Sequence, residues 1–200
     1  MPQLGPDEAR LKRRRLERRW GLRFELHETD PGSLRTFLRW KSEQYHRTGA
    51  FDVLSRPWVV EILERVHGTQ ADGFSGVFSC LYAGDSLVAA HLSLRSGPIL
   101  HSWFPAFDVE FAKFSPGLVL FLEIAEAAPA HGIRVFDFGK GDEPYKQLFA
   151  NSAIEVAAGS VERGRASAFT ARTARRVWSI ALHSPLYERA HRLRRRHELG

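Results

Sequence analysis

The densest group of chemically active side chains lies at residues 135–150, which read VFDFGKGDEPYKQLFA. Residues 135–138 are mostly apolar, as in a buried strand, and the glycines on either side of Lys140 end that strand. Pro144 then suits the first turn of a helix. Polar groups therefore gather at the carboxyl end of a core strand, where α/β sheets commonly place ligands. The six are Asp137, Lys140, Asp142, Glu143, Tyr145 and Lys146.

The same residues also have a purely structural explanation. Asp142 has the residue type that caps a helix, and the other charges would then be solvated. We interpret Asp142 by itself as a cap. A tight turn needs no Tyr145–Lys146 pair, however, so we interpret the cluster as a whole as a functional site.

Two helices should precede the sheet, and the first carries a second polar group. Asp30-Pro31 predicts a helix that runs to about residue 47, and a second helix follows over residues 57–68. Lys41 and Tyr45 lie near the end of the first helix, where they would either line an acceptor pocket or belong to a solvated helix end. The second helix should bury an apolar stripe of Trp58, Ile62, Leu63 and Val66.

Residues 74–104 alternate with the period of strands, and glycines at positions 84 and 97 predict the turns of an antiparallel meander. His91 falls on the polar face of the middle strand, as a base or as an ordinary edge histidine. Trp103 shares a face with His101 on the last strand. A strand at residues 22–26 and a closing hairpin at residues 154–161 complete the sheet.

A long apolar helix over residues 118–130 follows the meander. Ser115 is its predicted N-cap and Pro116 lies in its first turn. Gly117 leaves that turn without a side chain, so free amides and the positive end of the helix dipole offer a site for an anion such as a pyrophosphate. An ordinary capped core helix explains the same residues.

Charge is unevenly distributed along the 200 residues, whose net charge is +6. Residues 1–20 form a basic helical segment, residues 21–162 are net acidic, and residues 163–200 form a basic, amphipathic helical tail. We therefore expect a folded domain at residues 21–162 between two basic helical tails. An acidic body argues against nucleic acid as a partner, because phosphate binding needs positive charge at the site.

Composition excludes several classes of protein. The single cysteine, Cys80, rules out an internal disulfide framework, and the nine histidines lack the spacing of metal ligands, so we expect no metal. No apolar run reaches membrane-spanning length, and no signal-peptide block begins the sequence. These features indicate a cytoplasmic protein.

Taken in order, the elements predict an α/β (α+β) fold with a mixed, mostly antiparallel central sheet flanked by helices. This order resembles the GNAT acyltransferase fold. Residues 41–45 (KSEQY), 115–117 (SPG) and 137–146 (DFGKGDEPYK) are similar to the GNAT family associated with bacterial cellulose and exopolysaccharide biosynthesis, the CelD/BcsL type. The resemblance covers roughly residues 11–161.

The resemblance implies transfer of an acyl group, most simply acetyl, from acyl-CoA to an amine or hydroxyl of a small-molecule or saccharide acceptor. It also implies that the CoA pyrophosphate binds at the start of the long helix. The residues for this donor site are Lys113, Ser115, Pro116, Gly117 and Leu118.

Such a transfer needs a base for the nucleophile and an acid for the leaving thiolate. His91 and Glu143 are the candidate bases, and Tyr145 is the candidate acid. Lys146 would hold a carboxylate or phosphate, or else pair with its acidic neighbours, of which Asp142 is a further catalytic candidate. The acceptor side would include Lys41, Tyr45, Trp103 and Lys140.

Two features depart from the family pattern. A typical GNAT has an Arg/Gln-x-x-Gly-x-Gly/Ala loop before the long helix, whereas this chain has FAKFSPG at residues 111–117, which leaves Lys113 and fewer amides for the phosphates. Family members are also usually much longer, and this chain begins near the equivalent of their second half. We therefore expect a natural half-size protein, the product of a truncated gene, or the partner of a separate subunit that supplies the N-terminal half, with an oligomer as a further arrangement.

Two other classes of function stay open. A non-catalytic GNAT-like module would bind a partner or regulate an envelope-polysaccharide system. Alternatively, the basic tails would bind an anionic surface: the apolar stripe among the arginines of residues 163–200 suits an interfacial helix, which would hold the protein at the inner face of the cytoplasmic membrane.

Overall fold

The computed structural model describes residues 6–141 and 143–157. Residues up to 153 form one compact unit, and the predicted tail at residues 163–200 lies outside the described residues. The helices and strands are α1 Pro6–Trp20, β1 Leu22–Glu25, α2 Pro31–Thr48, α3 Pro57–Gly68, β2 Gln70–Ala71, β3 Phe74–Ala83, β4 Ser86–Ser96, β5 Ile99–Phe107, α4 Pro116–Ala127, β6 Val135–Asp137 and α5 Pro144–Phe149. Short 3₁₀ turns lie at Val53–Ser55, Val109–Phe114 and Ala128–His131.

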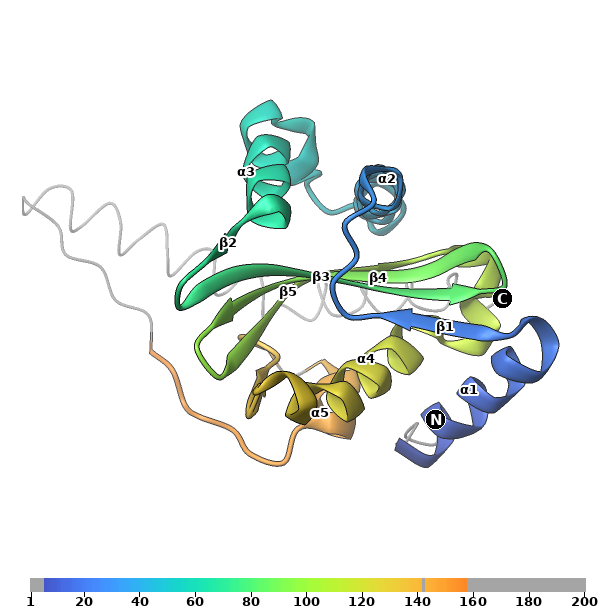
Figure 1. The fold of residues 1–200 in the computed structure, drawn as a ribbon. Helices are drawn as coiled ribbons and strands as arrows, with labels where there is room; N and C mark the ends of the chain where they lie inside the picture. Colours follow the sequence, from blue (N-terminus) through green and yellow to red (C-terminus); the bar gives the residue numbers. More distant parts are fainter. Residues whose placement is uncertain (1–5, 142, 158–200) are drawn as a thin grey trace, which may run out of the picture. The chain divides into compact units, whose positions relative to one another are not determined.

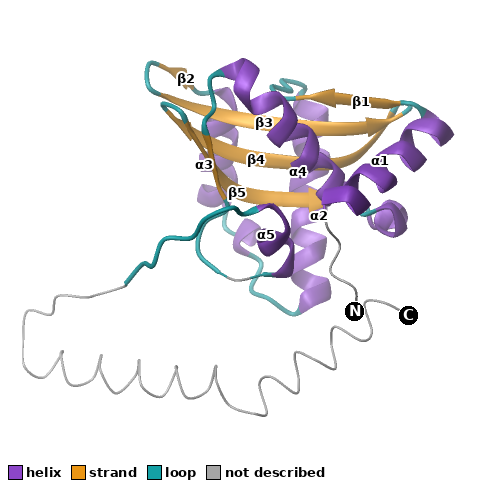
Figure 2. Ribbon diagram, turned by 90° about the horizontal axis from the view of Figure 1, so that it is seen from below, coloured by secondary structure: helices purple, strands orange, loops and turns teal. Residues whose placement is uncertain are grey.

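The strands form a mixed sheet in the order β1-β3-β4-β5-β6, with β2 paired to β3. Figure 2 shows β1, β3, β4 and β5 side by side. All these pairs are antiparallel except β5–β6, which is parallel. The meander arises because left-handed glycines, at φ 60° for Gly84 and 55° for Gly97, close the two tight turns. The predicted mixed, mostly antiparallel sheet is confirmed.

Helices cover both faces of this sheet (Figure 1). On one face α2 and α3 pack on a cluster around Phe37, Phe78 and Leu92, and on the other α1 and α4 pack on a cluster around Leu81 and Leu120. Successive strand residues point to opposite faces, so a strand covered on both sides is apolar at nearly every position. This explains why the residues of β3 from Val77 to Ala83 are all buried.

Helix α2 begins and ends where its sequence predicts. The carboxylate of Asp30 accepts a 2.7 Å hydrogen bond from the amide of Ser33, and Gly49 ends the helix in the left-handed conformation. Helix α3 also has the predicted bounds, but its apolar stripe is partly wrong. Leu63 is buried, whereas Trp58 and Ile62 are exposed.

Helix α3 approaches the sheet so closely that its backbone contacts β3. A Cβ atom on Gly76 would overlap the carbonyl oxygen of Val66, the residue of α3 that lies over it. Glycine at this position therefore has a packing reason, since any side chain would push α3 away from the sheet.

The basic N-terminal segment forms α1, as predicted, and it packs on the domain. Leu16 is fully buried in the cluster under α4, and Arg13 forms ion pairs with Glu123 and Glu126 of α4. The buried face of this segment is therefore part of the core of the domain. No helix among the described residues is both long and apolar enough to cross a bilayer.

Three further expectations differ from the structure. Helix α4 ends at Ala127 and continues only as a 3₁₀ turn, because Pro129 cannot donate the backbone hydrogen bond that an α-helix needs. Strand β6 is not a buried core strand: it has three residues and pairs on β5 alone, with Val135 exposed. In the described part of the predicted closing hairpin, Ile154 and Val156 are exposed and form no strand.

Candidate active site

The parallel pair β5–β6 forms only at one end. Ile99, Leu100 and His101 pair with β6, and the remaining residues of β5 have no partner strand on that side among the described residues. At the last paired position, the imidazole of His101 and the carboxylate of Asp137 form a hydrogen bond of 3.1 Å. Among the described residues, β5 therefore has no partner strand on this edge from Ser102 onward, an arrangement that can take an extended ligand.

The edge begins at a β-bulge. Ser102 pairs with Ser93 and Phe104 pairs with Leu92, so Trp103 is the extra residue on β5. Bulges re-aim a side chain and are frequent beside active sites. The ring of Trp103 packs on Phe104 at 4.8 Å and remains 39% exposed. Trp103 thus lies at the surface where β5 loses its second partner.

Aromatic rings of β6, α4 and α5 pack beside this edge. Phe121 of α4 stacks on Tyr145 with centroids 5.5 Å apart and an interplanar angle of 12°, and it meets His91 edge-to-face at 5.2 Å. Burial, with the nearby Glu143 carboxylate, raises the pKa of Tyr145. The rings that complete the group are Phe136, Phe138 and Phe149. Phe121 therefore packs on both Tyr145, the predicted acid, and His91, one of the two predicted bases.

His91 lies in the core rather than on a solvated polar face. Its ring nitrogens bond the hydroxyls of Ser102, at 2.9 Å, and Ser93, at 3.1 Å. Burial, together with the charge of Lys41, lowers the pKa of His91 to about 3, so the ring is neutral near pH 7. The polar-face prediction fails because α4 and β6 cover this face of β4.

Lys41 is also buried, with 8% of its surface exposed, so its end of α2 is not the solvated end that the sequence allowed. Its Nζ donates to the Oε1 of Gln44 at 2.9 Å and to the carbonyl of Pro105 at 3.0 Å. The rings of Tyr45 and Phe104 lie 5.3 and 5.9 Å from the nitrogen. Burial lowers the pKa of Lys41 to about 8.

The predicted cluster after β6 is only partly assembled. Lys146, 8% exposed, donates to the carbonyl of Lys140 at 2.7 Å and forms a 2.8 Å ion pair with Glu143. This is the ion pair that the sequence offered as the structural explanation of Lys146. Glu143 occupies the N-cap position of α5 without a side-chain cap bond, and Asp142, the predicted cap, lies outside the described residues.

The start of α4 has the predicted proline and glycine but a different cap. Ser115 adopts a left-handed backbone, with φ 50°, and makes no side-chain cap bond. Pro116 has no N–H, and the amides of Leu118 and Val119 both bond to the carbonyl of Ser115, so few amides of this turn remain for an anion. A Cβ on Gly117 would lie 3.8 Å from the ring of Phe107, at the end of β5. The Nζ of Lys113 lies 5.2 Å from the ring of Phe114.

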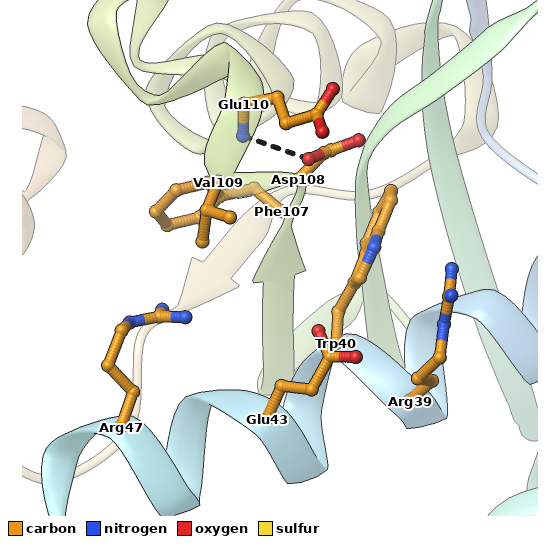
Figure 3. Close-up of a pocket in the computed structure, with 8 residues that line it drawn as sticks. All are labelled: Arg39, Trp40, Glu43, Arg47, Phe107, Asp108, Val109 and Glu110. Carbon is orange, nitrogen blue, oxygen red and sulfur yellow. Dashed lines mark hydrogen bonds between the residues drawn. The ribbon is translucent and has the colours of Figure 1, made fainter.

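A cavity of about 220 Å³ lies between α2 and the end of β5. Figure 3 shows side chains of α2 rising toward the residues that follow β5. Its lining combines two aromatic rings, two guanidinium groups and three carboxylates, from Arg39, Trp40, Glu43, Arg47, Phe107, Asp108 and Glu110, with Val109. Such a lining suits a polar ligand that carries both hydroxyl and charged groups.

A larger hollow of about 500 Å³ lies near the start of α2. There the hydroxyl of Tyr82 donates to Glu28 at 2.6 Å and lies 2.9 Å from the hydroxyl of Ser33, while Arg23 covers the Tyr82 ring. These polar groups satisfy one another. Among the described residues, no group of three or more His, Cys, Asp or Glu side chains is placed to hold a metal.

The structure brings His91 and Tyr145 together on the ring of Phe121, places Trp103 at the bulge of β5, and brings Lys41 to the same strand from α2. Sequence reasoning missed Phe121, Ser93 and Ser102 as their partners. Ser93 carried a signal, because it shares the strand face of His91. Phe121 carried none, since an aromatic residue in an apolar helix is typical of any core.

Comparisons with known proteins agree with this architecture. Residues 7–147 match the family model described as "Acetyltransferase (GNAT) domain". No curated protein sequence matches the chain. Among solved structures, the aminoglycoside acetyltransferase meta-AAC0020 from an uncultured soil metagenomic sample is similar in complexes with trehalose and with sisomicin. Both have a TM-score of 0.51 and cover 72% of this chain and 97% of theirs, at 15% and 14% identity.

The similarity to these structures establishes the fold, and the family model covers most of the chain. The expected GNAT-type architecture is therefore confirmed, with α4 following β5 and the open edge of β5 beside α5. The chain belongs to the GNAT acetyltransferase domain family.

Proposed function

We propose that the protein transfers an acyl group, most simply acetyl, from acyl-CoA to an amine or hydroxyl of a saccharide-like acceptor. The observation that carries this proposal is the parallel pair β5–β6 that stops after His101 and leaves the edge of β5 open beside Tyr145. An extended thioester donor can bond to such an edge through backbone groups, and the bulge at Trp103 lies beside its reactive end.

In the proposed reaction, the nucleophile attacks the thioester carbonyl, its proton passes to a base, and the C–S bond breaks as the thiolate leaves. Tyr145 is the proposed acid that protonates this thiolate. Its raised pKa keeps the phenol protonated near pH 7, as an acid requires. His91, with Ser93 and Ser102, would position β5 against β4 beneath the donor.

The donor phosphates would bind at Lys113 and residues 115–118, beside the end of β5. The first turn of α4 offers few amides, so Lys113 and the helix dipole would supply much of the attraction. The small number of amides at this site favours the second candidate function, a GNAT-like module that binds a partner without catalysis.

The acceptor would occupy the cavity between α2 and the end of β5 (Figure 3). Aromatic rings and carboxylates there suit the hydroxyls and ammonium groups of an amino sugar. The solved relatives were captured with trehalose and sisomicin, a choice of ligands that supports the saccharide class. The sequence resemblance to the CelD/BcsL type extends the proposal to exopolysaccharide precursors.

Calorimetry with acetyl-CoA tests the donor site directly. Gly117→Glu places a carboxylate where the phosphates would bind, and we expect binding to weaken by more than about 100-fold, or about 2.7 kcal/mol. Gly68→Glu, at the far end of α3 where a Cβ meets no atom within 4 Å, is the matched control. Equal affinity in both variants would contradict this donor site. Acetyl transfer to trehalose, sisomicin and glucosamine then decides between enzyme and binding module.

A further inference from the structure

Lys41 is a buried cation that has no carboxylate partner among the described residues. Of the described residues, those that bond its Nζ are Gln44 and Pro105, through an amide oxygen and a backbone carbonyl. No ion pair joins it to any carboxylate within the described ranges. Proteins rarely bury a lysine without a counter-charge, because desolvation of the ammonium is costly. Such a residue is a candidate for a chemical role.

The two hydrogen bonds of Lys41 leave one position on its nitrogen for a further proton. A neutral amine has two N–H groups and one lone pair, and both N–H groups are engaged by Gln44 and Pro105. The lone pair is then free to accept a proton. After it does so, the ammonium keeps both bonds and gains a third N–H at the same position. The geometry therefore supports either protonation state without rearrangement.

The position of Lys41 fits the proposed site. Pro105 lies on β5 beyond the last residue that pairs with β6, so the amine contacts the backbone of the open edge. On α2, Lys41 directly follows Trp40, which lines the proposed acceptor cavity. The rings of Tyr45 and Phe104 flank the nitrogen of this largely buried side chain.

The two bases that the sequence suggested are less suited to the task. His91 is fully buried under Phe121 and Phe136, and its nitrogens already bond two serine hydroxyls. Glu143 lies on the α5 side and is paired with Lys146. Lys41 alone among these approaches β5 from the helix that lines the acceptor cavity.

We propose that Lys41 is the general base of the transfer, a role that rests on the proposed acyltransferase function. The hydroxyl or amine of the acceptor attacks the acyl carbon. As the new O–C or N–C bond forms, the neutral amine of Lys41 takes the proton from the attacking oxygen or nitrogen. The C–S bond of the thioester breaks, and the thiolate takes its proton from Tyr145. When the products leave, Lys41 gives its proton to solvent and the phenolate of Tyr145 takes one back, which restores both side chains.

The titratable groups that face Lys41 are few. Tyr45 lies on the same helix, and burial and the charge of Asp52 raise its pKa. The charge of Lys41 also lowers the pKa of His91 of β4, but that ring points toward Phe121 and Phe136 on the other face of the sheet and is neutral at physiological pH. β5 contributes the uncharged Phe104 and Pro105. A single ionisation with a midpoint near the pKa of Lys41, about 8, should therefore control the rate.

Two substitutions separate a base from a fixed positive charge. Lys41→Arg keeps a charge and N–H donors but cannot lose its proton, and Lys41→Met removes both. We expect both to lower kcat/KM by on the order of 100-fold or more for the fastest acceptor of the panel, while acetyl-CoA affinity stays within about twofold. Arg18→Met, on the exposed side of α1, is the control and should keep the wild-type rate.

The pH profile gives the decisive readout. In the wild type, log kcat/KM should rise with unit slope up to pH about 8 and then level off, and the limb should be absent from Lys41→Arg. Wild-type activity in Lys41→Arg, or the same limb in that variant, would overturn the proposal.

Trace labelling of Lys41 with acetic anhydride at a series of pH values, read by peptide mass spectrometry, reports its ionisation without turnover. A midpoint near 8 supports the proposal, and a midpoint near the ordinary value of about 10.4 overturns it. These outcomes differ from failure of the function itself, in which the wild type would neither bind acetyl-CoA nor transfer an acetyl group to any acceptor of the panel.

Discussion

Two lysines of this domain are equally buried, at 8% exposure, yet they have opposite surroundings. Lys146, after β6, has the Glu143 carboxylate at 2.8 Å and a backbone carbonyl at 2.7 Å. Lys41, on α2, donates to two neutral acceptors at similar distances, and no carboxylate of the described residues pairs with it. Burial is therefore the same, and the difference lies in the counter-charge.

That difference separates a structural lysine from a reactive one. Lys146 has a carboxylate beside its ammonium, whereas Lys41 has neutral partners and its burial lowers the pKa of the amine to about 8. The sequence at residues 137–146 predicted a functional site because it contains acidic and basic side chains close together. The same property makes Lys146 a tether for the loop between β6 and α5.

The largest expected effect is on stability, from Lys41→Met. Burial moves the pKa of Lys41 from 10.5 to about 8, which corresponds to a cost of about 3 kcal/mol for the charged form. The methionine variant should therefore be more stable at pH 7, by up to about 3 kcal/mol. Urea unfolding at several pH values measures this gain.

The sign of the pH dependence provides the check. Because the unfolded chain binds the proton more tightly, wild-type stability should rise as pH increases from about 8 to 10.5, and it should be lowest below that window. Over the same pH range, the difference in free energy of unfolding between the wild type and Lys41→Met should shrink toward zero. A constant difference across the window would show that the charge of Lys41 costs nothing.

Gln44→Glu would give Lys41 the counter-charge that Lys146 has. The new carboxylate would replace the Oε1 that lies 2.9 Å from Nζ, which favours the ammonium and raises the pKa of Lys41. Turnover at pH 7 should fall about 10- to 100-fold and recover at higher pH. Gln147→Glu, on the exposed side of α5, adds the same charge elsewhere and should leave the pH profile unchanged.

The smallest effect is expected on the other lysine. Lys146→Met removes the bond to Lys140 and the ion pair, and we expect it to lower stability by about 1 kcal/mol, the opposite sign to Lys41→Met. Glu143→Gln should cost less, since half of the Glu143 side chain is exposed and solvent screens the pair. A gain of stability in Lys146→Met would erase the distinction between the two lysines.

Much of the fold was predictable because its signals are local. Asp30, Gly49 and the turn glycines set helix ends and hairpins through their own backbone bonds. The environment of His91 was not predictable from the sequence, because it depends on Phe121 and Phe136, which come from distant parts of the chain. The same holds for Lys41, whose partner Pro105 is 64 residues away. Alternation along β4 could not reveal that helices cover both of its faces.

Cys80 has a practical consequence for all these measurements. It is the single cysteine of the sequence, it is fully buried in β3, and burial raises the pKa of its thiol, so little reactive thiolate forms. A thiol reagent should therefore report released CoA against almost no background from the protein. For the same reason, a cysteine introduced at the exposed bulge position of Trp103 would accept a fluorophore at one defined place, and its emission would follow ligand arrival at the edge of β5.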